Sequence, residues 1–302
     1  MKKRHLRDLE VSAVGMGCMG FTHAYGQMPE EREGIRLVHR AFELGCDFFD
    51  TAEMYSCFRN EEFLGKAIKG LPRDRVIISD KFWPTHLPGQ DETIPKLSEA
   101  GIRKALEASL KRLGTDYIDL YTEHQMEDGS EEEVAAVMGK LVREGKIRAW
   151  GQSSPSVDQI RKAHAVTPIT AIQSEYSMME RKWEKDVLPL CRELGIGFVA
   201  FAPMGNGFLS GSIRAAGPLK RTTCAASSPA FPRRTCAQTS PCSISWAALR
   251  PKRAAPWPRL DLPGCSRDGI LSCPFRACER RSALSRIWVR PTSSSPTTSM
   301  PA

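Results

Sequence analysis

The sequence predicts an α/β fold of the TIM-barrel type, a (β/α)8 barrel that is incomplete, with about seven βα units and a disordered C-terminal tail. From about residue 11, short apolar runs alternate with longer amphipathic stretches, which is typical of βα units around a parallel sheet. The runs occupy residues 11–17, 46–51, 75–81, 117–124, 147–153, 169–175 and 197–203. They give seven candidate strands, and no eighth run follows them.

The stretches between the runs contain residues that are typical of helix starts and ends. Ser130 and Glu133 have the spacing of a capping box, and Gly145 marks the end of the same stretch. The apolar face of this expected helix comprises Val134, Val137, Met138, Leu141 and Val142. The preceding helix follows the same scheme, with three leucines at helical spacing before Gly114.

Composition separates the chain into two parts. The 302 residues are 41% hydrophobic and 26% charged, which is enough for a core, and the formal net charge is +8. Residues 1–211 carry a net charge of −4 and residues 212–302 one of +12. The second part also holds 12 of the 21 Pro and 6 of the 10 Cys residues. We predict a truncated barrel domain over 1–211 and a disordered basic tail over 212–302.

The sequence gives no sign of a membrane or secretory segment. It has no run of 18 or more apolar residues, and its basic start lacks an apolar region of signal-peptide length. We therefore expect a cytoplasmic protein with reduced cysteines and no membrane partner. The histidines at 23, 86 and 164 lack metal-ligand spacing and no C-x-x-C pair occurs among the first four cysteines, so no metal site is expected.

Ionisable residues follow consecutive predicted strands. Asp50 ends the second run, Tyr55 lies five residues later, Lys81 ends the third run and His124 ends the fourth. In a barrel these strand ends meet at one mouth. Carbonyl reduction needs a hydride from a nicotinamide and a proton from a general acid, and we expect Tyr55 to be that acid. Lys81 would lower its pKa, Asp50 would keep Lys81 charged, and His124 would orient the substrate oxygen.

Each of these residues also has an ordinary structural interpretation. Tyr55 could be a packing residue, Lys81 a solvated strand end, Asp50 a turn cap and His124 a satisfied buried imidazole. Their joint position after three consecutive strands favours the catalytic interpretation.

Seven ordered segments resemble the aldo/keto reductase family over residues 9–211. They are GMGCMGF (15–21), DFFDTAEMY (47–55), NEEFLGKAI (60–68), RLGTDYIDLY (112–121), LVREGKIRAWGQSS (141–154), AIQSEYSMM (171–179) and FAPMGNGFLSG (201–211). The D-x-x-x-x-Y element with the downstream Lys and His is the specific part. The resemblance implies an NADPH-dependent oxidoreductase on a TIM barrel, with Tyr55 as proton donor and Asp50, Lys81 and His124 completing a tetrad.

The same resemblance implies a set of cofactor-binding residues. Ser153 and Gln173 would hold the nicotinamide carboxamide, and Phe201 would stack on the ring. Met19 and Asp50 would also contact the cofactor, and the pyrophosphate would be bordered by Pro203, Met204 and Gly205. The chain departs from the family at Ser56, Ser174, Phe201 and Asn206, where the family often has Gly, Asn, Tyr and Arg.

The tail resembles coding DNA translated out of frame. Shifted codons, each taking the third base of one residue and the first two of the next, permit EDDMRRFLPRFSEENLRANLALLD from Leu219 and VLPIPGMRT from Leu271. A third permitted string, GCTMAQARLAWLLARRD, begins at Arg253. Together they resemble the family's seventh helix, eighth strand and cofactor loop. We infer a frameshift between about Gly211 and Leu219, which would leave strands one and seven with unpaired edges and make the chain prone to aggregation.

Two alternatives remain for the function. One is an inactive relative or a barrel that binds without catalysis. The other interprets the tail as a basic, Pro-rich arm for nucleic acid or acidic partners, but it lacks the Lys blocks and interleaved aromatics of such arms. We therefore expect a small-molecule carbonyl substrate and no nucleic-acid partner. The oligomeric state is not predicted.

Overall fold

The computed structural model describes residues 1–23, 28–207, 209 and 270–273. Apart from these last four residues, the tail expected over 212–302 lies outside the described residues. So does the family-like out-of-frame string that begins at Leu219.

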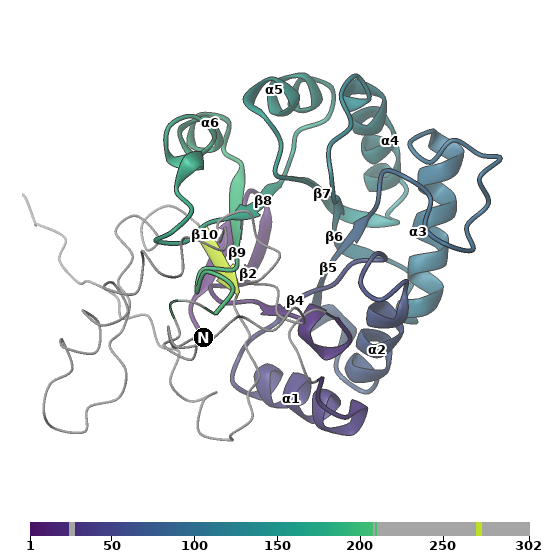
Figure 1. The fold of residues 1–302 in the computed structure, drawn as a ribbon, viewed down its shortest axis with the longest axis vertical. Coiled ribbons are helices and arrows are strands. Elements are labelled where there is room, and N and C mark those ends of the chain that lie inside the picture. The colour runs from purple at the N-terminus through teal and green to yellow at the C-terminus, as the bar shows by residue number, and fades with distance from the viewer. Residues whose placement is uncertain (24–27, 208, 210–269, 274–302) are drawn as a thin grey trace, which may run out of the picture.

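Eight parallel strands form one curled sheet in the order β10-β9-β8-β7-β6-β5-β4-β3 (Figure 1). Their bounds are β3 Met16–Gly17, β4 Phe48–Asp50, β5 Ile77–Phe82, β6 Ile118–Glu123, β7 Ile147–Ser153, β8 Ala171–Glu175, β9 Gly197–Phe201 and β10 Ile270–Cys273. All seven strands expected from the sequence are present, and the TIM-type fold class is confirmed. Every neighbouring pair is parallel, as a helix crossover between consecutive strands requires.

The first expected strand is divided in two. Its beginning belongs to β2 (Leu9–Ser12), which pairs antiparallel with β1 (Lys3–Leu6) in a hairpin that the sequence analysis did not foresee. Three hairpin residues, Leu6, Leu9 and Val11, pack in one apolar cluster with inward-facing residues of the barrel strands. A Cβ on Gly197, the first residue of β9, would lie 2.7 Å from the Cα of Leu6. The hairpin therefore covers the N-terminal end of the barrel.

The helices lie around the outside of the curled sheet in chain order (Figure 1). They are α1 Glu31–Glu43, α2 Arg59–Ile68, α3 Glu99–Leu113, α4 Glu131–Arg143, α5 Val157–Val166 and α6 Val187–Leu194, with short 3-10 turns at Met19–Phe21, Arg73–Arg75 and Lys182–Glu184. Their apolar faces and the outward-facing strand residues form the larger core cluster. The site-bearing strand ends are thus held between two packed layers.

One of the helix boundaries expected from the sequence has the expected cap, and another does not. Gly114 ends α3 in the left-handed conformation, as expected. The capping box expected at Ser130 is wrong, because the Ser130 hydroxyl donates to the Glu127 carbonyl oxygen and leaves the α4 N-terminus without a side-chain cap. A capping box occurs instead at α5, between Ser156 and Gln159.

The expectation that the seventh strand would keep an unpaired edge is also wrong. Strand β10 pairs with β9 in register, Ile270 opposite Phe198 and Cys273 opposite Phe201. Sheet pairing uses backbone N–H and C=O groups, so a short extended segment can occupy an edge whatever reading frame encoded its side chains. Within the described residues, the sheet holds the seven expected strands and β10, and β10 and β3 are its two unpaired ends, so the barrel is incomplete as expected.

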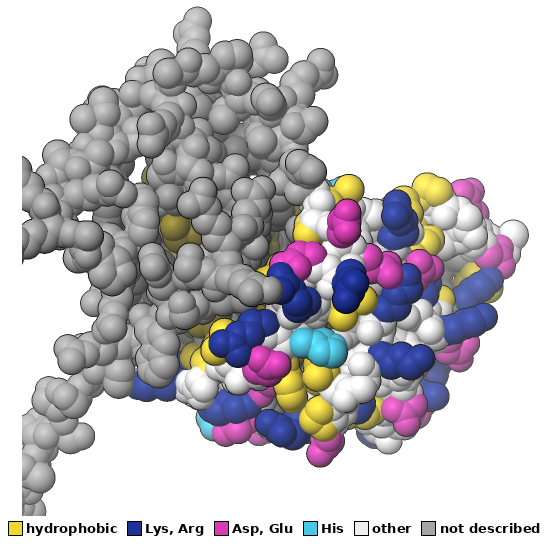
Figure 2. Space-filling model, turned by 90° about the horizontal axis from the view of Figure 1, so that it is seen from below, with side chains coloured by type: hydrophobic (Ala, Val, Ile, Leu, Met, Phe, Trp, Pro, Cys, Tyr) yellow, Lys and Arg dark blue, Asp and Glu magenta, His cyan; other side chains and the backbone are white. Residues whose placement is uncertain are grey.

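Opposite charges are mixed on the surface of the helices. On the face shown in Figure 2, Lys and Arg side chains lie among Asp and Glu side chains. Several of these form ion pairs between neighbouring helices, such as Lys66 with Glu31 at 2.8 Å and Lys140 with Glu99 at 2.6 Å. A search of the described residues finds no helix with the length and apolar character that crossing a bilayer requires.

Glu123 gives a first prediction about stability. Its carboxyl group is buried at the end of β6, and this burial raises its pKa to about 8 from an ordinary 4.5. The native state then keeps a proton that the unfolded chain loses, so stability falls as the pH rises from 4.5 towards 8. At about 1.4 kcal/mol per pH unit, the loss is at most about 5 kcal/mol.

The substitution Glu123→Gln removes this loss because an amide does not ionise. We expect the variant and the parent to melt at similar temperatures near pH 5, and the variant to melt about 5 °C higher or more near pH 8. Thermal unfolding of both proteins across this pH range measures the effect. A constant difference in melting temperature would contradict it.

Candidate active site

The four predicted catalytic residues meet at the C-terminal ends of β4, β5 and β6. Asp50 is the last residue of β4, Lys81 lies in β5, and His124 directly follows β6. Tyr55 lies in the turn between β4 and α2. This is the end of the barrel where TIM-barrel active sites form, because the βα loops there are free to vary.

Lys81 is the centre of the cluster. Its side chain is fully buried, and its Nζ lies 2.6 Å from Asp50 Oδ2, 2.7 Å from the Thr51 carbonyl oxygen and 3.2 Å from Tyr55 Oη. Burial alone would lower the pKa of this amine. The charge of Asp50, together with the hydrogen bonds to Asp50 and Tyr55, outweighs burial and raises the pKa of Lys81. The lysine therefore stays charged beside the phenol.

The expected lowering of the pKa of Tyr55 is wrong for this structure. Burial raises the pKa of the phenol more than the charge of Lys81 lowers it, and the Asp50 charge adds to the rise. Tyr55 therefore holds its proton across the neutral pH range. Lys81 still matters chemically, because its ammonium lies within hydrogen-bond reach of the oxygen that becomes negative once that proton leaves.

The ring of His124 packs edge-on against Tyr55 and Trp83. The ring centroids lie 5.5 Å from that of Tyr55 and 5.0 Å from that of Trp83, both at 85°. The Nδ1 atom has no hydrogen-bond partner among the described residues. Burial, and then the charge of Lys81, hold the pKa of His124 well below 6.5. A neutral imidazole can donate one hydrogen bond to a carbonyl oxygen without bringing a second positive charge.

This gives a second prediction. The ring of His124 should stay neutral from about pH 6 to pH 8, so its proton resonances should not titrate in this range. An NMR titration, assigned with the His124→Asn variant, measures this directly. A titration midpoint for His124 inside that range would refute the prediction.

The turn that carries Tyr55 is conformationally strained. Ser56, Cys57 and Phe58 all have positive φ angles, 52°, 46° and 75°, a conformation that costs non-glycine residues of the order of 1 kcal/mol or more each. The departure from the family's glycine at Ser56 is thus accommodated in a left-handed conformation. The Ser56 hydroxyl compensates by donating to the Thr22 carbonyl oxygen.

The residues expected to hold a cofactor lie around the same mouth. Ser153, the last residue of β7, is the register partner of Gln173 in the middle of β8. Both are buried, and Gln173 Nε2 donates to Asp50 Oδ1 at 2.8 Å. Phe201 ends β9 with 38% of its surface exposed. The remaining expected residues lie in the 3-10 turn after β3, which holds Met19, and in the turn after β9, which holds Pro203, Met204 and Gly205.

Sequence reasoning missed three residues that support this site. Glu53 and Lys96 form a buried ion pair at 2.7 Å, and Trp83 packs against His124. Glu53 lies inside the DFFDTAEMY motif, between the site residues Asp50 and Tyr55, and this position could have indicated that it belongs to the site. Nothing in the sequence indicated that Lys96, 43 residues later, would be its partner.

The comparisons with known proteins identify the family. The model of the aldo/keto reductase family matches residues 13–256, which is most of the chain and extends past Gly211. The chain belongs to the aldo/keto reductase family. A similar curated protein is "Probable aldo-keto reductase 1" from Glycine max, 44% identical over 206 residues, which are 68% of this chain and 59% of that protein. This family member therefore spans less than two thirds of the relative's length.

Solved structures give the same result for the fold of this aldo/keto reductase. The glycerol dehydrogenase AKR11B4 from Gluconobacter oxydans aligns with a TM-score of 0.70 at 28% identity, over 79% of this chain and 74% of that one. An aldo/keto reductase from Klebsiella pneumoniae, solved in complex with NADP and acetate, aligns with a TM-score of 0.57 at 34% identity. That alignment covers 68% of this chain and 70% of the other.

Proposed function

We propose that this barrel is an NADPH-dependent reductase of small aldehydes or ketones, with Tyr55 as the proton donor. The observation that carries the proposal is the buried Lys81 ammonium, which contacts both Asp50 and the Tyr55 oxygen at the open end of the barrel. The side chain of Lys81 is not exposed to solvent, and its Nζ is hydrogen-bonded to Asp50, the Thr51 carbonyl oxygen and Tyr55. The arrangement suits a reaction that leaves a negative charge on the phenol oxygen.

The residues divide the work as follows. Tyr55 gives its proton to the substrate oxygen, and Lys81 stabilises the phenolate that remains. Asp50 balances the charge of Lys81 and is itself held by the Ser79 hydroxyl at 2.9 Å and the Gln173 amide at 2.8 Å. His124 presents a neutral ring edge to the same oxygen. Bound NADPH supplies the hydride.

The chemistry of the mouth fits a nicotinamide. A carboxamide both donates and accepts hydrogen bonds, and the serine hydroxyl of Ser153 and the amide of its register partner Gln173 offer both kinds of group. Phe201 presents an exposed aromatic ring at the next strand end, which suits stacking on a planar ring. The Klebsiella pneumoniae relative, solved with NADP, supports the same cofactor class. The groups expected to grip the adenosine 2′-phosphate fall outside the described residues.

We further infer that the tail is read out of frame, that residues 1–211 are a truncated barrel domain, and that the activity belongs to a frame-corrected chain in the cytoplasm. The free thiols of Cys18, Cys46, Cys57 and Cys191 suit that reducing compartment. A carbonyl substrate also requires neither a nucleic-acid nor a membrane partner.

A direct assay tests the proposed activity. The frame-corrected chain should oxidise NADPH when given small aldehydes and ketones, and it should do so faster with at least one of them than with none. NADPH binding without any turnover would instead support a non-catalytic barrel. Failure to bind NADPH at all would contradict the proposal.

A further inference from the structure

Glu53 lies in the catalytic turn but points away from the catalytic tetrad. Its side chain is fully buried, while its backbone N–H donates to the Lys81 carbonyl oxygen at 3.0 Å. Both carboxylate oxygens face the loop of residues 83–98, which connects β5 to α3. The backbone N–H of Trp83 donates to Oε1 at 2.6 Å, Lys96 Nζ donates to Oε1 at 2.7 Å, and Gln90 Nε2 donates to Oε2 at 3.1 Å.

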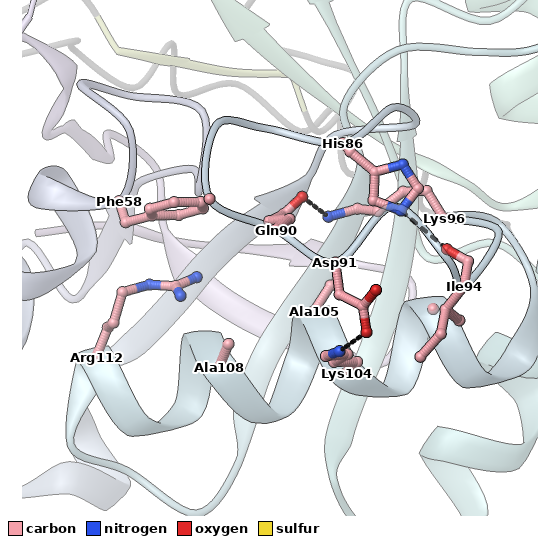
Figure 3. A pocket seen from close by; sticks show the side chains of 12 residues that line it. Phe58, His86, Gln90, Asp91, Ile94, Lys96, Lys104, Ala105, Ala108 and Arg112 are labelled. Carbon is pink, nitrogen blue, oxygen red and sulfur yellow. Dashed lines mark hydrogen bonds and ion pairs between the residues drawn. The ribbon is translucent and has the colours of Figure 1, made fainter.

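The loop is organised around these contacts. Lys96 is buried, and its Nζ also lies 3.0 Å from Gln90 Oε1, which in turn accepts the backbone N–H of Leu87 at 2.9 Å. Figure 3 shows Gln90 and Lys96 meeting above α3. Both residues line a cavity of about 290 Å³. The loop lacks helix and strand hydrogen bonds, so this cluster of side chains sets much of its conformation.

The loop carries a residue that contacts the catalytic ring. Trp83 is its first residue, and the Trp83 indole packs edge-on against His124, whose ring packs edge-on against Tyr55. The backbone N–H of Trp83 is the group that Glu53 holds. The Glu53 carboxylate therefore connects the turn that carries Tyr55 to Trp83, the residue that packs on His124.

We propose that the Glu53–Lys96 ion pair is a positioning element for the active site. It holds Trp83 and His124 in their packed positions beside Tyr55. The inference rests on the proposed reductase function for its catalytic consequence. Its structural consequence, an ordered 83–98 loop tied to the catalytic turn, does not depend on activity.

The Glu53–Lys96 pair can hold the loop in place because both side chains are buried. A carboxylate that accepts three hydrogen bonds and faces an ammonium is satisfied inside the protein, whereas either charge without its partner is costly to bury. A second ion pair, between Asp91 of the same loop and Lys104 of α3, offers a contrast. Lys104 pairs with Asp91 at 2.7 Å, but these side chains are 54% and 40% exposed, so water can replace either partner.

The test compares three single variants of the full chain: Lys96→Met, Lys96→Arg and the matched control Lys104→Met. Hydrogen exchange is measured over residues 83–98 and 51–58, and over the remote strand β7 as a reference. In Lys96→Met we expect exchange in the first two segments to rise about tenfold or more, with β7 unchanged. Lys104→Met should leave all three segments as in the parent. Lys96→Arg keeps the charge and should restore most of the protection.

The same substitutions in the frame-corrected chain test the catalytic consequence. Lys96→Met should lower kcat about tenfold while the KM for NADPH stays within about twofold, because the expected cofactor residues lie on β7, β8 and the turn after β9 rather than on this loop. Equal exchange in Lys96→Met and Lys104→Met would overturn the positioning role, and so would an equal rise in β7, which means general destabilisation. If the parent lacks reductase activity, the proposed function fails, and the exchange data alone decide on the positioning role.

Discussion

Replacing Tyr55 by phenylalanine should abolish most of the turnover and leave cofactor binding intact. The substitution removes one oxygen, the atom that lies 3.2 Å from Lys81 Nζ, and keeps the ring that packs against His124. General acid catalysis contributes about 10² to 10⁴ in rate, and we expect kcat of the frame-corrected chain to fall by a factor in this range. NADPH affinity, measured by fluorescence titration, should change by less than about twofold because the expected nicotinamide contacts come from other strands.

Tyr176 offers a matched control. This second tyrosine is buried beside Phe198, and its hydroxyl donates to Glu184 at 2.7 Å, far along the chain from the tetrad. Tyr176→Phe removes the same atom at a structural position, so kcat should hardly change. Unchanged turnover in Tyr55→Phe would exclude Tyr55 as the acid, and equal losses in both variants would point to a general packing effect.

Restoring the reading frame should restore NADPH binding. The basic residues that grip the adenosine 2′-phosphate in this family are expected after the eighth strand, where this chain instead has Phe275, Arg276, Ala277 and Cys278. Charge-assisted hydrogen bonds are worth about 1.5–3 kcal/mol each, so the loss of two weakens binding about 100-fold or more. We expect the chain as written to bind NADPH very weakly or not at all, and the frame-corrected chain to bind it tightly.

Two measurements decide this prediction. Resequencing the DNA between the Gly211 and Leu219 codons shows whether one or two extra bases are present, and fluorescence titration compares the two proteins. Titration with NADH is the matched control, since it lacks the 2′-phosphate and should gain less from the corrected frame. Equal and tight NADPH binding by both proteins would refute the frameshift and the assignment of the phosphate grip to the lost segment.

The sheet itself could be predicted because its signal is local. Runs such as that ending at Lys81 alternate with helical periodicity, and burial of both faces of a parallel sheet imposes exactly such apolar runs on the sequence. The hairpin β1–β2 was missed because its four-residue strands are short and its role depends on Gly197, nearly 190 residues later. Strand β10 was missed because backbone pairing leaves no side-chain pattern to detect.

The site divides in the same way. The positions of Asp50, Lys81 and His124 at three consecutive strand ends are fixed by the topology, so their convergence followed from the spacing of the runs. The pKa of Tyr55 did not follow, because it is a balance between burial and the charge of Lys81, and sequence reasoning included only the charge. The Lys96 partner of Glu53 also escaped, since an irregular loop has no periodicity from which its path can be read.

The sequence by itself therefore determined the barrel class, the order of its strands and the four residues that gather at its mouth. These properties follow from the hydrophobic periodicity and from the parallel topology, and both can be inferred from the order of apolar and amphipathic segments in the sequence. The tertiary structure alone decided which edge β10 occupies, which side chains Glu53 holds, and whether the phenol of Tyr55 is more or less acidic than in water. Such properties depend on which groups are buried against one another and shielded from water. This burial is decided only when segments distant in the chain pack together.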